Sequence, residues 1–105
     1  MDNQLKRGFL EICVLAALKN NDLYGYKLVE VLNPYIEISE STLYPILKRL
    51  EENACLTNYT IEHNSRLRKY YKITEKGREK ILIFLEEWQE ILKIYNFVKE
   101  GNAHG

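Results

Sequence analysis

The sequence contains no long apolar run and no excess of charge of either sign. No stretch approaches the roughly 20 apolar residues that a membrane-spanning helix requires, and the first residues lack the basic segment and cleavage site of a signal peptide. The 15 basic and 15 acidic residues cancel, which argues against a protein that coats polyanions without selectivity. We therefore expect a cytoplasmic protein that does not bind a membrane.

Residues that hold metals or perform catalysis are also scarce. The two histidines, His63 and His104, lie far apart in the chain. The two cysteines, Cys13 and Cys55, lie in apolar segments without the close spacing of a zinc site, so we expect them to be reduced and buried. The sequence also lacks a serine–histidine–aspartate order, a phosphate-binding loop and paired carboxylates at a cleft. We expect no enzyme activity, no metal and no cofactor.

The chain has enough apolar residues for one folded domain. It has 105 residues, of which 46% are apolar, and domains of this size can bury a core of their own. Apolar positions recur at helical spacing in four segments. These predicted helices are residues 5–19, 24–33, 40–52 and 75–99.

A β-hairpin is predicted between the third and fourth helices. Residues 56–62 and 67–73 alternate in the manner of strands, and residues 63–65 form the turn. Because Tyr70 and Tyr71 alternate across the second strand, one of them should face the core. The fold class is therefore mainly α with a small β-hairpin, with a further very short strand expected at residues 36–38.

Capping residues stand at the ends of the predicted helices. Either Ser39 or Ser41 can accept hydrogen bonds from the first turn of the third helix, and Thr74 can do the same for the fourth. Asn53 can adopt the left-handed conformation that ends the third helix. The proline after Asn33 ends the second helix.

The third helix has an apolar face and a polar, basic face. Leu43, Leu47 and Leu50 share the apolar face, and the hairpin that follows carries much of the positive charge. Residues 66–80 contain seven basic and two acidic residues. A polar helix followed by a basic hairpin is the arrangement of a winged helix-turn-helix, so we expect binding to double-stranded DNA. The candidate DNA-binding residues are Ser41, Thr42, Tyr44, Pro45, Lys48, Arg49, Arg66, Arg68, Lys69 and Tyr24.

Each of these candidates also has a purely structural interpretation. Ser41 can be a helix cap, and Tyr24 and Tyr44 can pack against the core. Lys48 and Arg49 can belong to a solvated helix face, and the basic hairpin can be solvated as well.

The first and last helices carry more apolar surface than so small a domain can cover. Residues 5–19 are apolar nearly all round, and residues 75–99 carry an apolar stripe more than about 100° wide on a helix roughly 37 Å long. We therefore expect residues 1–74 to form the DNA-binding domain. Residues 75–100 should form a dimerisation helix that packs on the first helix of a partner, and residues 101–105 a flexible tail.

Four motifs in this order resemble the PadR family of bacterial transcriptional regulators. They are Tyr24-Gly-Tyr26, Thr42-Leu-Tyr-Pro-Ile-Leu-Lys-Arg-Leu50, Arg68-Lys-Tyr-Tyr71 and Thr74-Glu-Lys-Gly77, and the resemblance extends over residues 5–98. The single C-terminal helix is similar to that of the short subfamily, which includes multidrug-responsive repressors. The resemblance implies a homodimeric repressor, and the symmetry of a dimer implies a pseudo-palindromic operator.

The resemblance also implies a ligand site between the protomers. In the short members, a tryptophan of the last helix stacks flat aromatic drugs with its symmetry mate, and Trp88 matches that position. The effector would be a planar aromatic or lipophilic compound. The alternative for Trp88 is ordinary core packing. The residues expected to complete the pocket and the interface are Phe9, Ile12, Ala16, Leu85, Leu92 and Tyr95.

The chain departs from the family pattern at two places. The turn His63-Asn-Ser65 lacks the glycines that are common there, which leaves the path of the wing tip open. Ala54-Cys55 stands where a glycine and an apolar residue are usual. The alternative function is a dimeric module that binds a small molecule or a protein without recognising an operator.

Overall fold

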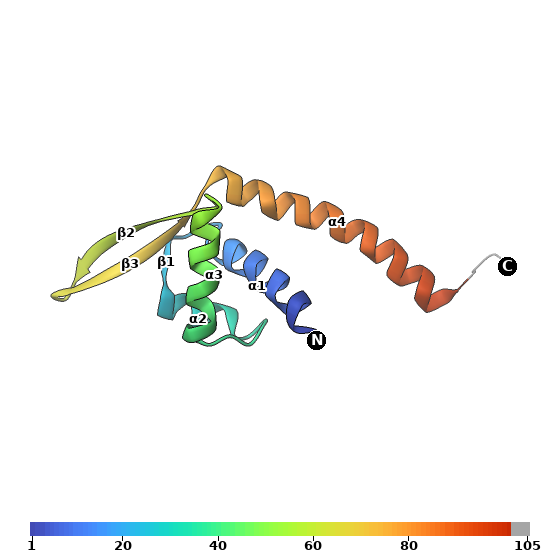
Figure 1. Cartoon of the computed structure of the whole chain (residues 1–105), viewed down its shortest axis with the longest axis horizontal. Coiled ribbons are helices and arrows are strands. Elements are labelled where there is room, and N and C mark those ends of the chain that lie inside the picture. The colour runs from blue at the N-terminus through green and yellow to red at the C-terminus, as the bar shows by residue number, and fades with distance from the viewer. Residues whose placement is uncertain (102–105) are drawn as a thin grey trace.

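Residues 1–101, which the computed structural model describes, form four helices and three strands (Figure 1). The elements in chain order are α1 (Asn3–Ala17), β1 (Leu23–Tyr24), α2 (Gly25–Leu32), α3 (Glu40–Glu52), β2 (Leu56–His63), β3 (Arg66–Ile73) and α4 (Glu75–Glu100). The β2–β3 hairpin and α4 project from opposite sides of the helical body, so the molecule measures 68 × 26 × 21 Å. The prediction of a mainly α fold with a small sheet is confirmed.

The core forms where α1, α2 and α3 meet the base of the sheet. Leu43, Leu47 and Leu50 of α3 are at most 1% exposed, which confirms the apolar face predicted for this helix. Ile46 is buried beside them, so the covered face is wider than expected. The other core residues are Leu10, Val14, Leu15, Leu18, Leu28, Leu32, Ile38, Cys55, Leu56, Tyr71, Ile73 and Ile81.

The sheet contains a strand that the sequence did not reveal. Its order is β1-β3-β2, all antiparallel, and Leu23 and Tyr24 of β1 pair with Tyr71 and Tyr70 of β3. A strand of two residues has no period of its own, so only its neighbour identifies it.

The prediction of a strand at residues 36–38 is wrong. This segment is a loop whose backbone is hydrogen-bonded to the side chain of Asn33. The amide nitrogen of Asn33 donates to the carbonyl of Ile38 at 3.1 Å, and the Ile38 N–H donates to the amide oxygen at 3.3 Å. Asn33 thus takes the place of a neighbouring strand while Ile38 is buried.

Caps confirm most of the predicted helix ends. Ser39, and not Ser41, caps α3, since its hydroxyl accepts from the N–H of Thr42 at 3.3 Å. Thr74 caps α4, because its hydroxyl accepts from the N–H of Gly77 at 3.1 Å. Asp2 caps α1, which therefore begins two residues before the predicted start.

The end of α3 differs from the prediction by one residue. Asn53 has a φ of −87°, and Ala54 is the residue in the left-handed region, with a φ of 62°. The N–H of Cys55 donates to the carbonyl of Leu50 at 2.8 Å and that of Ala54 to Glu51 at 2.9 Å. These two bonds make a Schellman motif, in which glycine is the usual left-handed residue.

The hairpin closes through a two-residue turn. His63 pairs with Arg66, which leaves Asn64 and Ser65 as the loop, with φ of 50° and 63°. Two successive positive φ values are the signature of a type I′ turn, which suits the twist of the strands. The path of the wing tip is therefore defined without the glycines that usually occupy such turns.

Gly77 lets α4 lie close to the body. A Cβ atom at this position would lie 2.5 Å from the carbonyl oxygen of Cys55 and 2.7 Å from a side-chain carbon of Ile73. Glycine is therefore required here by close approach and not by its backbone angles. α4 contacts α1 and β3 and then extends beyond them (Figure 1).

Three smaller expectations complete the comparison. Cys55 is buried as predicted, but Cys13 is only half-buried, and both carry free thiols. Among the described residues, no helix combines the length and apolarity needed to cross a bilayer. The tail expected at residues 101–105 lies, except for Gly101, outside the described residues.

We predict that Ala54→Gly raises the free energy of unfolding by about 0.5–1 kcal/mol. An alanine in the left-handed region costs about 1–2 kcal/mol, and the greater freedom of glycine in the unfolded chain offsets part of the gain. Urea denaturation measures the difference. Asn53→Gly is the matched control and should give no gain, because φ is negative there. Equal gains at both positions would contradict this explanation.

Candidate nucleic-acid interface

The outer face of α3 presents hydroxyl and basic groups. The apolar face is turned into the core, so Ser41, Tyr44 and Lys48 are exposed. The Ser39 hydroxyl lies 3.0 Å from that of Ser41 and 3.1 Å from that of Thr42. These hydroxyls surround the N-terminal end of the helix, where free N–H groups and the helix dipole favour a phosphate.

Pro45 lies on the same exposed side, in the second turn of α3. It has no N–H to donate to the carbonyl of Ser41, so that carbonyl lacks its helical partner. The outward face of the first turns thus offers hydroxyl, N–H and carbonyl groups together. This mixture suits hydrogen bonding to base edges and phosphates.

Tyr44 lies at the edge of α3 that faces the start of α2. A Cβ atom on Gly25 would lie 2.6 Å from the Tyr44 hydroxyl oxygen. The glycine of Tyr24-Gly-Tyr26 therefore makes room for Tyr44. Tyr44 remains 46% exposed, so its side chain packs against Gly25 and still presents surface to solvent.

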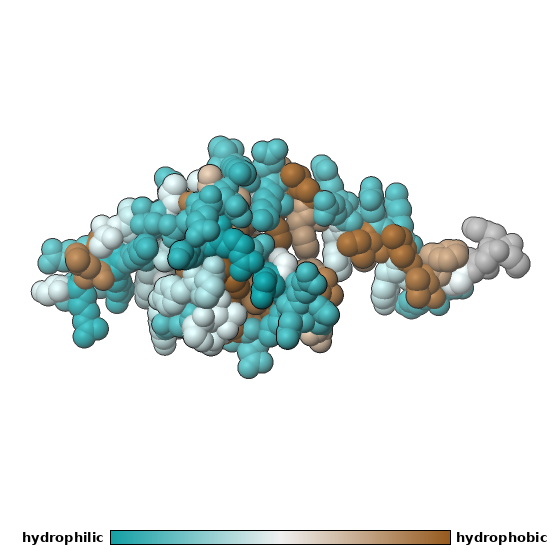
Figure 2. All heavy atoms as spheres, viewed as in Figure 1, coloured by the Kyte–Doolittle hydropathy of each residue, from teal (hydrophilic) through white to brown (hydrophobic). Residues whose placement is uncertain are grey.

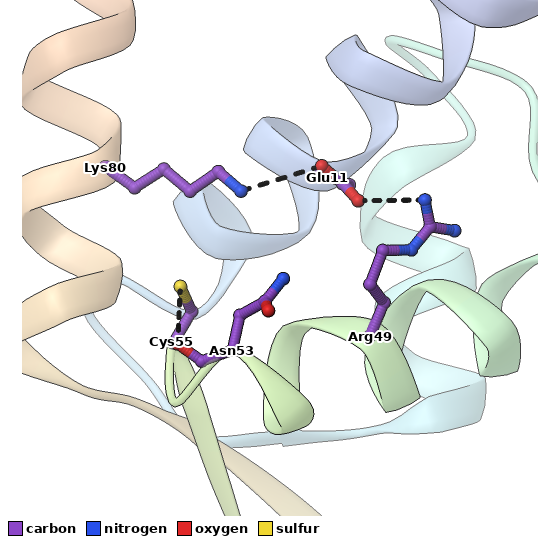
Figure 3. Close-up of polar contacts among 5 residues, drawn as sticks. All are labelled: Glu11, Arg49, Asn53, Cys55 and Lys80. Atoms are coloured by element: carbon purple, nitrogen blue, oxygen red, sulfur yellow. Dashed lines mark hydrogen bonds and ion pairs between the residues drawn. The ribbon is translucent and has the colours of Figure 1, made fainter.

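Arg49 lies on the opposite flank of α3, beside α1. Its guanidinium is 3.3 Å from one carboxylate oxygen of Glu11, and the amine of Lys80 on α4 is 3.6 Å from the other (Figure 3). Only 15% of the Glu11 side chain is exposed, against 37% for each cation. Arg49, expected to contact DNA, is thus held toward the body of the protein.

Stacked aromatic rings support the basic hairpin at its base. The rings of Tyr59 and Tyr70 are 5.7 Å apart and nearly parallel, and the Tyr24 ring meets Tyr70 edge-on at 5.5 Å. The guanidinium of Arg68 lies 4.5 Å from the centre of the Tyr24 ring. Tyr24 therefore packs against the hairpin and orients a basic side chain at once.

Tyr71 is the inward-facing member of the tyrosine pair. It is 4% exposed, and burial raises the pKa of its hydroxyl. Lys69 lies over its ring at 5.7 Å. Arg68 and Lys69 of β3 thus each lie over a tyrosine ring, Arg68 over Tyr24 and Lys69 over Tyr71.

A groove of about 700 Å³ connects the hairpin to the start of α2 and to α3. Basic residues of β3 line it together with tyrosines from β1, α2, α3 and β3. The lining residues are Tyr24, Gly25, Tyr26, Tyr44, Arg66, Leu67, Arg68, Lys69 and Tyr71. The structure therefore gathers all three predicted hairpin residues with Tyr24 and Tyr44 around one groove.

A second cluster, made of aromatic residues, joins α1 to α4. Phe9 meets Trp88 edge-on at 5.4 Å and Phe84 at 6.0 Å, and Phe84 stacks on Trp88 at 5.9 Å. All three side chains are half-buried. Of the other residues expected here, Ile12 is half-buried, and the exposed ones are Ala16, Leu85, Leu92 and Tyr95.

Several residues at these sites were not among the sequence-predicted candidates, among them Phe84, Glu11, Asp22 and Lys80. Phe84 precedes Trp88 by four residues, a helical spacing that could have identified it. Glu11 is the one acidic residue within α1, and a lone acid on an apolar helix was a usable signal. Asp22 and Lys80 gave no such signal, because their partners Tyr59 and Glu11 are distant in sequence.

The chain also matches known proteins over most of its length. The model of the PadR-like family of transcriptional regulators matches residues 14–82, which is more than half of the chain. This chain belongs to the PadR-like family of transcriptional regulators. The resemblance inferred from the four motifs is thereby confirmed, and so is the winged-helix fold.

Three solved structures illustrate the likeness. A PadR family regulator of Eggerthella lenta is 33% identical, covers 94% of this chain and 88% of its own, and has a TM-score of 0.83. A PadR-like regulator of Bacillus cereus is 30% identical over 95% of this chain and 100% of that chain, with a TM-score of 0.81. PadR of Bacillus subtilis, solved in complex with operator DNA, is 25% identical over 72% of this chain and 46% of that chain, with a TM-score of 0.66.

We predict that Asp22→Asn lowers the pKa of Tyr59 toward its ordinary value. The Tyr59 hydroxyl donates to the Asp22 carboxylate at 2.6 Å, and this hydrogen bond, with smaller effects of desolvation and charge, raises the Tyr59 pKa. A raised pKa stabilises the fold below the unfolded tyrosine value of about 10, and that contribution is lost as the pH rises through the folded pKa.

NMR titration of the tyrosine rings measures the change, and Tyr59→Phe identifies the Tyr59 signal. The stability difference between wild type and Asp22→Asn should shrink above about pH 10. An unchanged Tyr59 titration in Asp22→Asn would show that the hydrogen bond does not persist in solution.

Proposed function

We propose that this PadR-like protein is a homodimeric repressor that binds a pseudo-palindromic operator in the cytoplasm. In this proposal residues 1–74 form the DNA-binding domain, α3 enters the major groove, and the β2–β3 hairpin grips the backbone. The observation that carries the proposal is the groove between Tyr44 of α3 and the basic residues of β3. It brings reading helix and hairpin together around a cavity of phosphate-binding character.

The distribution of charge agrees with this orientation. Arg66, Arg68 and Lys69 lie together on β3, and Lys48 is exposed on α3. A neutral protein whose basic residues gather locally is attracted to DNA there without coating it. The remaining proposed contacts are Ser41, Thr42, Tyr44, Pro45, Arg49 and Tyr24.

The apolar surface of α4 supports dimerisation. Figure 2 shows hydrophobic residues gathered on the part of α4 that projects beyond the body. The exposed apolar residues of α4 are Leu82, Ile83, Leu85, Ile91, Leu92, Ile94, Tyr95, Phe97 and Val98. Soluble monomers rarely leave so many large apolar side chains exposed close together. A second copy, pairing residues 75–100 with α1 of its partner, would cover it.

The same arrangement supports an effector site. Trp88 is half-buried against Phe9 and Phe84, and its exposed part would lie on the proposed interface. Two symmetry-related Trp88 rings would form a sandwich for a planar aromatic or lipophilic compound. Such a compound regulates DNA binding if it prefers one spacing of the two reading helices over the other.

We predict that Lys48→Ala combined with Arg68→Ala abolishes operator binding and preserves the dimer. Each charge contributes a phosphate contact, so for the non-specific binding that remains the slope of log affinity against log salt should fall by about two per protomer. Fluorescence anisotropy with DNA from upstream of the protein's own gene, against random competitor DNA, measures binding. Sedimentation measures the dimer.

The control is Lys19→Ala combined with Lys93→Ala, which removes equal charge at exposed positions away from the groove. It should leave the salt slope nearly unchanged. Affinity for DNA that survives the Lys48 and Arg68 substitutions would contradict the proposed interface. Weak binding by the wild type, erased by salt, would favour the module without operator recognition.

We predict that proflavine, a planar aromatic cation, quenches Trp88 fluorescence in the absence of DNA. Trp88 is the single tryptophan, so the signal reports one position. Trp88→Ala should weaken binding about tenfold, as the loss of an aromatic stack does. Calorimetry measures this loss.

Tyr35→Ala is the matched control, because Tyr35 is an aromatic residue that is 85% exposed and lies outside α1 and α4. It should keep the affinity of the wild type for proflavine. Equal loss in both variants would place the dye away from Trp88.

A further inference from the structure

We propose that Glu11 competes with a DNA phosphate for Arg49, and that Lys80 sets how firmly Glu11 holds it. This inference rests on the proposed DNA-binding function. It assigns roles to two residues, Glu11 and Lys80, that touch no DNA themselves. Both act on binding through the position of Arg49.

The first observation is the shared carboxylate. Arg49 and Lys80 take different oxygens of Glu11, at 3.3 Å and 3.6 Å, and Figure 3 shows Glu11 between them. One carboxylate thus forms ion pairs with two positively charged side chains from two different helices. Removing Lys80 would leave the whole carboxylate to Arg49, and removing Glu11 would leave Arg49 without a partner.

The second observation is the position of Arg49 on α3. It lies seven residues, or about two turns, beyond Thr42, so both face the same flank of the helix. Both also line an open hollow of about 700 Å³ between α1 and α3. This hollow gives the Arg49 side chain room to turn away from Glu11 toward the outer face of α3.

The third observation is the charge around that hollow. Lys6 and Arg7 of α1 line it together with Arg49. Among the described residues that line the hollow, Glu37 is the one acidic residue. A phosphate that approached the flank of α3 would therefore meet three cations. Arg49 would gain a bidentate partner there in exchange for the single contact to Glu11.

The fourth observation is which helices carry Lys80 and Glu11. Lys80 belongs to α4, the proposed dimerisation helix, and Glu11 to α1, which touches Trp88 through Phe9. A shift of α4 against α1 changes the distance between Lys80 and Glu11. The freedom of Arg49 to reach DNA would then follow the arrangement of the dimer.

The test compares affinity for the upstream duplex and its salt dependence in a set of variants. Glu11→Gln should bind two- to fivefold more tightly, which corresponds to losing a partly exposed ion pair. Its salt slope should steepen by up to about one per protomer, because Arg49 adds one phosphate contact. Lys80→Gln should bind more weakly, because Glu11 then holds Arg49 alone.

Glu11 and Lys80 act through Arg49 in this proposal. Replacing Arg49 should therefore abolish the effect that substitutions of Glu11 and Lys80 have on affinity. In an Arg49→Gln background, Glu11→Gln and Lys80→Gln should change affinity only as their matched controls do. The controls are Glu79→Gln and Lys76→Gln, which make the same charge changes at exposed positions on α4. A role confined to stability would lower the unfolding midpoint and leave the salt slope unchanged.

The outcomes separate this inference from the proposed function. Absence of selective binding by the wild type overturns the proposed function and this inference with it. Selective binding by the wild type, combined with Glu11→Gln that binds no more tightly than Glu79→Gln, overturns this inference alone. Effects that persist without Arg49 do the same. Lys80→Gln gives an independent result if Glu11→Gln folds poorly.

Discussion

The burial of one face of α3 determines most of what the surface of this protein presents. Leu43, Leu47 and Leu50 are at most 1% exposed, and such burial contributes about 1.5–3 kcal/mol for each side chain. A rotation of α3 that brought Lys48 inward would lose that energy and bury a charge. The outward position of Ser41, Pro45 and Lys48 is therefore a consequence of packing.

The segments that leave α3 carry the backbone strain of the fold. Ala54 adopts a left-handed conformation so that the chain can turn from α3 into β2, and Asn64 and Ser65 do so at the tip of the hairpin. An alanine or serine in that region costs about 1–2 kcal/mol, and asparagine tolerates it better. The Schellman bonds at Cys55 and the ladder between β2 and β3 hold these residues in place. The direction of the hairpin thus depends on the same contacts that end α3.

Helix α1 contacts both α3 and the projecting helix α4. One side buries Leu10, Val14 and Leu15 in the core, and Phe9 meets Trp88 of α4. Glu11 binds cations from both α3 and α4. Because protein interiors are packed closely and transmit small displacements, a displacement of the aromatic cluster would reach the proposed DNA-binding surface through α1.

The sequence by itself determined the helices, the hairpin and the family. The leucine spacing of α3, the cap at Thr74 and the four motifs depend on residues near one another in the chain, and local patterns report local structure. Tertiary structure decided the strand β1, the loop at residues 36–38 and the left-handed residue at Ala54. It also decided that Arg49 faces Glu11 and that Tyr44 packs on Gly25. The loop at residues 36–38 and the turn at Ala54 are held by hydrogen bonds between residues three to five positions apart, which apolar periodicity does not report. The other features join residues far apart in sequence, and no periodicity records which distant side chain will lie within reach.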